Sequence, residues 1–167
     1  MTESLSQHRH ISFTAHYTGY IWYKMGISHP VFATSKGKFL AKLVHPLESW
    51  AERHVGGSMR TTLKQRHQMI DEHLGQLISE YLQVLEIASG LSPRSWNFRQ
   101  KFPGINYREL DLPDMARIKT NALQQIDQDA PEVLSADIFS AELANIFKVF
   151  DPQKPSPVQL SAARLVC

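Results

Sequence analysis

The chain has 167 residues, of which 43% are hydrophobic and 20% charged, and 18 Lys and Arg against 16 Asp and Glu leave a formal net charge of +2. This balance excludes an intrinsically disordered chain, because the apolar fraction suffices for a core and the net charge is small. The small net charge also argues against nucleic acid as a partner. No run of 18 apolar residues occurs, so we predict no transmembrane helix and no membrane partner.

The single cysteine, Cys167, excludes a disulfide framework and a cysteine-based zinc site. The polar N-terminus lacks the apolar run of a secretory signal peptide. Both features favour a reducing compartment, and we expect a cytoplasmic location. All eight histidines lie at or before His73, but they form no HExxH pattern and have no cysteine near them, so we predict no metal site.

Three helices are predicted in the first 80 residues. Apolar residues recur at three- and four-residue spacing from Phe13 to Met25, as on one helix face, and Gly26 ends that segment. A second face comprises Phe39, Leu40, Leu43, Val44 and Leu47. A third, long amphipathic helix carries Met59, Leu63, Ile70, Leu74, Leu77, Ile78 and Tyr81. This part of the chain is basic, with nine Lys and Arg against five Asp and Glu over residues 1–75.

The periodicity changes near residue 80, where short apolar runs begin to alternate with helical segments. Residues 84–88 predict a buried strand that ends at a glycine turn, and Ser92-Pro93 begins a helix that runs to about Lys101. We predict further strands over 105–111 and 133–138, and further helices from Pro113 and over 141–150. This alternation is typical of a parallel α/β sheet.

The turn after the first of these strands is where the pattern predicts a ligand. Backbone N–H groups at a helix N-terminus point into the crevice at the carboxyl end of the strand. Neither GxGxxG nor GK[ST] is present, which disfavours a nicotinamide or nucleoside-triphosphate enzyme. Asp111, 21 residues after Gly90, is placed to accept hydrogen bonds from a ribose, and Glu109 is the alternative. A ribose contact without a pyrophosphate loop suggests a nucleoside cofactor such as S-adenosylmethionine.

Four segments, in a characteristic order, then point to a family. They are ISFTAHYTGY at 11–20, RHQMID at 66–71, EIASGLSPR at 86–94 and ELDLP at 109–113. Together they resemble the N-terminal lid, the Arg-x4-Asp helix and the first two motifs of the leucine carboxyl methyltransferase-like family, over about residues 11–150. The first motif departs from the usual form at Ala88, where many members have glycine, and at Ser92, where many have aspartate.

The resemblance implies a Rossmann-like class I methyltransferase sheet and S-adenosylmethionine as cofactor. Arg66 would hold the methionine carboxylate, Glu86 and Gly90 would lie beneath the amino and sugar groups, Asp111 would bind the ribose, and Asp137 would reach the adenine. Each residue also has a plain structural interpretation, namely a solvated helix arginine, a strand-to-helix turn or a helix cap.

The family's fourth motif, an acidic-Gly-Leu run that helps to build the acceptor site, has no counterpart after Asp151. We therefore expect a truncated gene product with an incomplete sheet of about three parallel strands. Its regions would be a helical lid over 1–80, a partial cofactor-binding sheet over 81–155 and an irregular tail over 156–167. An exposed sheet edge left in this way favours self-association.

The expected function is O-methyl transfer to a carboxylate or hydroxyl of a small molecule or peptide, with reduced or absent activity. No catalytic residue is assigned, and a carboxylate acceptor needs no general base. Two alternatives remain open. One is a non-catalytic nucleoside-binding or interaction module derived from a methyltransferase, and the other is a helical regulatory protein with an incidental α/β segment.

Overall fold

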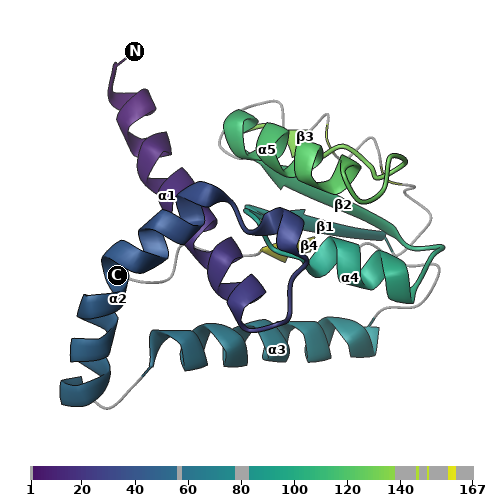
Figure 1. Ribbon diagram of the computed structural model, residues 1–167. Coiled ribbons are helices and arrows are strands. Elements are labelled where there is room, and N and C mark those ends of the chain that lie inside the picture. The colour runs from purple at the N-terminus through teal and green to yellow at the C-terminus, as the bar shows by residue number, and fades with distance from the viewer. Residues whose placement is uncertain are drawn as a thin grey trace.

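The computed structural model describes residues 2–55, 58–77, 83–137, 146, 150 and 158–160 (Figure 1). The elements, in chain order, are α1 (Thr2–Lys24), the 3-10 turn η1 (Pro30–Phe32), α2 (Ser35–Val55), α3 (Met59–Leu77), β1 (Gln83–Ile87), α4 (Arg94–Lys101), β2 (Asn106–Asp111), α5 (Pro113–Gln124), β3 (Leu134–Ser135) and β4 (Val158–Leu160). Within this part of the chain, none of the helices combines the length and the apolar character needed to cross a bilayer.

In the described part of the chain, four strands form one parallel sheet in the order β3-β2-β1-β4. The three predicted strands are confirmed, although β3 is only two residues long. From β1 the chain steps outward through β2 to β3, and it then returns to the opposite side of β1 with β4. The direction of the strand order therefore reverses beside β1, as in a Rossmann-like sheet, whose ligands bind outside the carboxyl ends of the strands at this point.

The expectation of an irregular tail over 156–167 is wrong at Val158–Leu160, which form β4. This strand pairs with β1 from Leu85↔Val158 to Ile87↔Leu160. Three residues are too few for a strand periodicity to be recognised, so pairing with the buried β1 defines this strand. Among the described strands, β1 is consequently not at an edge of the sheet, and β3 and β4 hold the edge positions. Self-association through a sheet edge stays a prediction.

The two faces of the sheet differ because side chains alternate along each strand. One face buries an aliphatic cluster of Leu85, Ile87, Leu110, Ala136 and Ile146. The other face packs against α3 and α4 through Leu74, Val84, Phe98, Ile105 and Tyr107. Farther along the strands, this second face carries acidic side chains. The predicted helix over 141–150 lies outside the described residues, except for Ile146 and Phe150.

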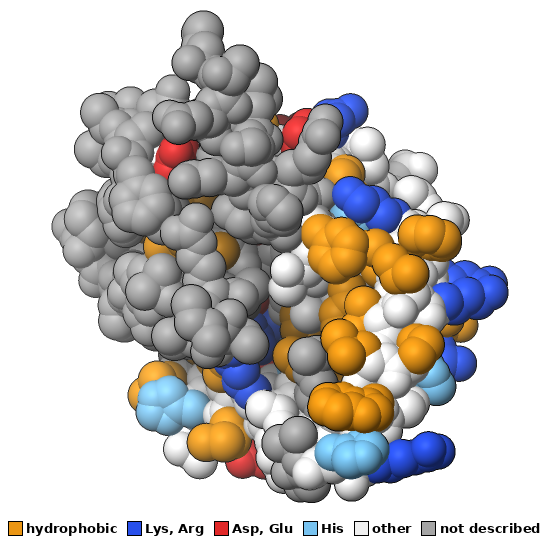
Figure 2. Space-filling view, turned by 90° about the vertical axis from the view of Figure 1, so that its left-hand side faces the viewer, with side chains coloured by type: hydrophobic (Ala, Val, Ile, Leu, Met, Phe, Trp, Pro, Cys, Tyr) orange, Lys and Arg blue, Asp and Glu red, His pale blue; other side chains and the backbone are white. Residues whose placement is uncertain are grey.

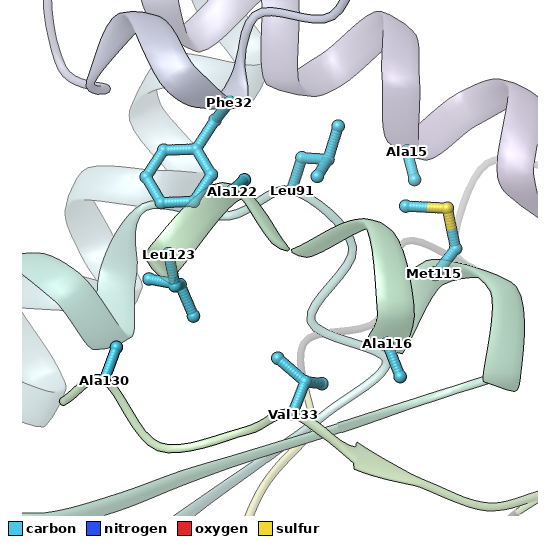
Figure 3. Close-up of a cluster of buried hydrophobic side chains, with 9 residues drawn as sticks. All are labelled: Ala15, Phe32, Leu91, Met115, Ala116, Ala122, Leu123, Ala130 and Val133. Atoms are coloured by element: carbon cyan, nitrogen blue, oxygen red, sulfur yellow. The ribbon is translucent and has the colours of Figure 1, made fainter. Parts of the chain in front are cut away.

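The N-terminal helices pack over the loop that follows β1. Ala15 of α1, Phe32 of η1 and Leu91 of this loop are buried in one cluster, which α5 and the segment after it complete (Figure 3). The remaining members of the cluster are Met115, Ala116, Ala122, Leu123, Ala130 and Val133. Residues far apart in the sequence are thus joined at the turn where the sequence predicts a ligand.

The second predicted helix face is only partly buried. Leu40 lies in the α1–α2 interface with Tyr17, Ile21 and Ala41, and Val44 packs beside them. Phe39, Leu43 and Leu47 point outward and are 64%, 63% and 67% exposed. Helical periodicity assigned these apolar residues to one helix face, but the position of α1 decides which of them are covered.

Replacing Gly37 tests how closely α1 and α2 pack. A Cβ at Gly37 would lie 2.2 Å from the backbone oxygen of His16, whereas a Cβ at Gly75 of α3 would meet nothing within 4 Å. We expect Gly37→Ala to lower the free energy of unfolding by about 1–3 kcal/mol through overpacking. Gly75→Ala should raise it by about 0.5–1 kcal/mol through helix propensity. Urea denaturation measures both changes, and effects of the same sign would contradict the close contact.

Candidate functional site at the carboxyl ends of β1 and β2

The loop after β1 turns through two residues in the left-handed region, Ala88 with φ of 56° and Gly90 with φ of 52°. Glycine adopts this conformation freely, whereas an alanine pays about 1–2 kcal/mol. Ala88 is the position at which the resembled motif usually has glycine, so this departure places strain in the turn. The Ala88 N–H donates to the oxygen of Leu110 at 2.8 Å, which ties the turn to the end of β2.

Asp111 joins this loop to the end of β2. Its Oδ2 accepts a 2.6 Å hydrogen bond from the Gly90 N–H, and its Oδ1 accepts a 2.8 Å bond from the Leu112 N–H. Burial raises the pKa of Asp111, and the two N–H donors offset only part of that effect. The spacing of 21 residues between Gly90 and Asp111 therefore corresponds to a direct contact.

The predicted residue Asp137 follows the carboxyl end of β3, which lies beside the carboxyl end of β2. The N–H of Ala136 donates to the backbone oxygen of Asp111 at 3.2 Å, and Asp137, partly exposed, is the next residue. The parallel pairing of β2 with β3 brings these residues together, because the carboxyl ends of both strands lie on the same side of the sheet. Of the two acidic candidates at the end of β2, Asp111 contacts the loop. Glu109 instead is buried and forms an ion pair with Lys119 of α5.

Glu86 lies below the loop and is fully buried. Its Oε1 is 2.6 Å from Nη1 of Arg94, and its Oε2 accepts a 3.0 Å hydrogen bond from the hydroxyl of Tyr107. Burial raises the pKa of the Tyr107 hydroxyl, and the negative charge of Glu86 adds to that rise. Both oxygens of Glu86 are thus engaged by protein groups inside the interface between the sheet and its helices.

Arg94 connects this interior to α3. Its Nε donates to Oδ1 of Asp71 at 2.5 Å, and its Nη2 lies 3.2 Å from Nδ1 of His67. The planar guanidinium suits this arrangement, since its donors point in several fixed directions at once. The predicted residue Arg66 precedes His67 on α3 and is partly buried. The structure therefore links the helix that carries Arg66 to the loop through Arg94.

Two buried residues of this region, Arg94 and Lys119, have partners that the sequence interpretation did not assign. Arg94 stood in a recognised motif, but nothing in its spacing indicated a pair with Glu86 and Asp71. Lys119 carried a usable signal, because it falls within the buried stripe of α5 that also contains Met115, Ala116, Ala122 and Leu123. Burial raises the pKa of Glu109, and the charge of Lys119 acts in the opposite direction.

The space immediately above the turn is occupied by α1. Ala15 Cβ lies 3.3 Å from where a Cβ of Gly90 would be, and Leu91 Cβ lies 2.7 Å from the corresponding position of Gly19. Any ligand placed against Gly90 therefore competes with α1 for this space. A groove of about 480 Å³ lies elsewhere, between α3 and α4, with Asp71 in its lining. Among the described residues, no three His, Cys, Asp or Glu side chains are arranged to hold a metal ion.

Asp71→Asn tests the link between α3 and Arg94. Burial alone would raise the pKa of Asp71, but hydrogen bonds from His67 and Arg94 and their charges hold it below its ordinary value near 3.8. The stabilisation that this carboxylate contributes is therefore fully present at a pH above its ordinary pKa, and it is lost as the pH falls through the lowered pKa. We expect the variant to lose about 1.5–3 kcal/mol of unfolding free energy at neutral pH.

The same difference should shrink toward zero in acid, because Asp71 of the unchanged chain then also loses its charge. Urea denaturation at successive pH values from neutral to acid measures it, and Glu72→Gln, on the exposed neighbour, is the control with little expected effect. A loss of equal size at all pH values would show that the charge of Asp71 is not responsible.

The comparison with known families covers the elements of this region from α2 onward. The family model described as leucine carboxyl methyltransferase matches residues 29–161, which include α2, the loop after β1, the end of β2 and β4. The comparisons found no match among curated proteins and none among solved structures. Methyltransferases of this family have a Rossmann-like fold, in agreement with the parallel sheet described above. The chain belongs to the leucine carboxyl methyltransferase family.

Proposed function

We propose that this chain binds S-adenosylmethionine at the carboxyl ends of β1 and β2, and that it serves O-methyl transfer to a carboxylate or hydroxyl of a small molecule or peptide. The hydrogen bond from Gly90 to Asp111 is the observation that carries the proposal. It places a glycine turn beside a carboxylate at the point where the strand order reverses. Membership of the family supports the reaction class.

The residues at this edge fit a nucleoside chemically. Each oxygen of Asp111 accepts one backbone N–H bond and retains capacity for a second donor, such as a ribose hydroxyl. Gly90 presents no side chain, so a sugar can lie against its backbone. Arg66 would hold a carboxylate of the ligand through charge-assisted bonds, and Asp137 would accept from an exocyclic amine. Glu86 would support the site from below by holding Arg94.

S-adenosylmethionine supplies a methyl group on a sulfonium centre, which transfers by in-line displacement. The tasks left to the protein are alignment and a site with little water. The contacts of Arg94 join α3, the helix that carries Arg66, to β1. Helix α1 covers the turn from outside, so in our proposal it shifts from Gly90 to admit the ligand and then excludes water.

We further propose that turnover is reduced or absent, because the acidic-Gly-Leu motif of the acceptor site is missing from the sequence. The alternative function is a non-catalytic nucleoside-binding or interaction module that uses the same residues. A helical regulatory protein does not agree with the parallel sheet or with the family match. The cytoplasmic location stays a prediction.

Calorimetric titration of the full chain with S-adenosylmethionine and S-adenosylhomocysteine tests the cofactor site. We expect Asp111→Ala and Arg66→Ala each to weaken binding by about ten-fold or more, since each removes charge-assisted hydrogen bonds. Asp114→Ala and Arg117→Ala are matched controls, because these side chains are 84% and 72% exposed, and they should leave the affinity unchanged.

Thermal unfolding verifies that each variant is folded, and Asp111→Asn, which keeps one acceptor, is the milder replacement. Unchanged affinity in both Asp111→Ala and Arg66→Ala would contradict the site. Turnover with a panel of carboxylate and hydroxyl acceptors then separates a methyltransferase from a non-catalytic module.

A further inference from the structure

The outward side of α2 carries four exposed apolar side chains, Phe39, Leu43, Leu47 and Trp50, which we call the α2 stripe. Their spacing of four, four and three residues places them on one side of the helix. They are 64%, 63%, 67% and 57% exposed, whereas Leu40 and Ala41, which pack on α1, are buried. The stripe is therefore a second apolar face in addition to the one that forms the core.

Basic side chains border the α2 stripe. Lys36, Lys42 and Arg53 are exposed and lie within about a quarter turn of its centre line, as the helical repeat places them. The two acidic residues of α2 lie elsewhere. Glu48 is buried and hydrogen-bonded to Tyr17 of α1 and to Arg60 of α3, and Glu52 lies on the opposite side of the helix from Leu43.

The stripe lies on an outer side of the molecule. Figure 1 shows α2 at the margin of the molecule, away from the sheet. Figure 2 looks onto this side, where hydrophobic side chains gather next to Lys, Arg and His. Trp50 stacks on His54 with 4.9 Å between ring centroids. Each of the four residues of the stripe is nevertheless more than half exposed.

We propose that the α2 stripe binds the surface of a membrane containing anionic lipids, with α2 lying along that surface. Phe, Leu and Trp side chains on one side of a helix bury at the boundary between headgroups and acyl chains, and bordering Lys and Arg interact with the lipid phosphates. The interface accepts exposed apolar side chains without requiring a matching groove. The expectation of no membrane partner rested on the lack of a spanning segment, and binding along the surface is a different mode.

A second copy of the chain fits the stripe less well. Two stripes of four side chains would bury a total of only about 1,000 Å², at the lower limit for a specific dimer. The basic borders of both copies would also be brought together, which opposes association. Charge thus favours an anionic surface over a second basic one.

Cosedimentation of the full chain with large vesicles tests the proposal. We compare vesicles of phosphatidylcholine alone with vesicles of phosphatidylcholine and phosphatidylglycerol, and we expect the partition coefficient to be at least about ten-fold higher for the mixture. Added salt should weaken binding, because it screens the exposed charges. Equal binding to both kinds of vesicle would overturn the proposal.

Two pairs of variants assign the binding to the stripe. Leu43→Gln with Leu47→Gln should reduce partitioning by about ten-fold or more, whereas Met69→Gln, at a 69% exposed position of α3, should not change it. Lys42→Gln with Arg53→Gln should weaken binding to anionic vesicles several-fold, whereas Lys64→Gln with Arg117→Gln, the same loss of charge elsewhere, should have a much smaller effect. Circular dichroism confirms that these surface variants are folded.

Three other results would overturn the proposal. Unchanged vesicle binding in the Leu43→Gln, Leu47→Gln variant would place the binding elsewhere. A dimer in sedimentation velocity without lipid, lost in that variant, together with no vesicle binding, would assign the stripe to a second copy. Saturable binding of an acidic amphipathic peptide, again without vesicle binding, would assign it to a protein partner.

Discussion

The arrangement of the candidate site depends on one buried ion-pair network centred on Arg94. Its guanidinium lies 2.6 Å from Glu86 of β1 and 2.5 Å from Asp71 of α3, and all three charges would be costly inside the protein without one another. His67, which also contacts Arg94, packs against Trp22 of α1 with 5.3 Å between ring centroids. Arg94 therefore joins β1 to α3 directly, and His67 extends this connection to α1.

The packing of α1 against the loop after β1 explains the glycine residues at this contact. Gly90 and Gly19 allow α1 to approach the turn, and Gly90 also donates its N–H to Asp111. The same turn thus serves packing and the proposed cofactor contact, so access to the site and closure of α1 are coupled. Ala88 adds strain to this turn, and the fold carries that cost because the hydrogen bond to Leu110 fixes the backbone there.

The parts of the fold that were predictable rest on local pattern. Val84 to Ile87 form a run before a glycine turn that is apolar except for Glu86, and the spacing from Gly90 to Asp111 matches one strand–helix–strand unit. The parts that were not predictable depend on partners distant in sequence. β4 is defined by pairing with β1, Lys119 pairs with Glu109 of another element, and the exposure of Leu43 depends on where α1 lies. Burial and pairing of single residues require the tertiary structure.

The most direct test of this account is the stability of Arg94→Met, measured by urea denaturation together with hydrogen exchange of α3. Removing the guanidinium leaves the carboxylates of Glu86 and Asp71 without their cationic partner. We therefore expect the free energy of unfolding to fall by about 3–5 kcal/mol and hydrogen exchange to become faster along α3 and the loop. Arg99→Met, on the same helix, whose guanidinium lies 4.0 Å from Asp127, should cost much less. A loss below about 1 kcal/mol with unchanged exchange of α3 would contradict the central role of Arg94.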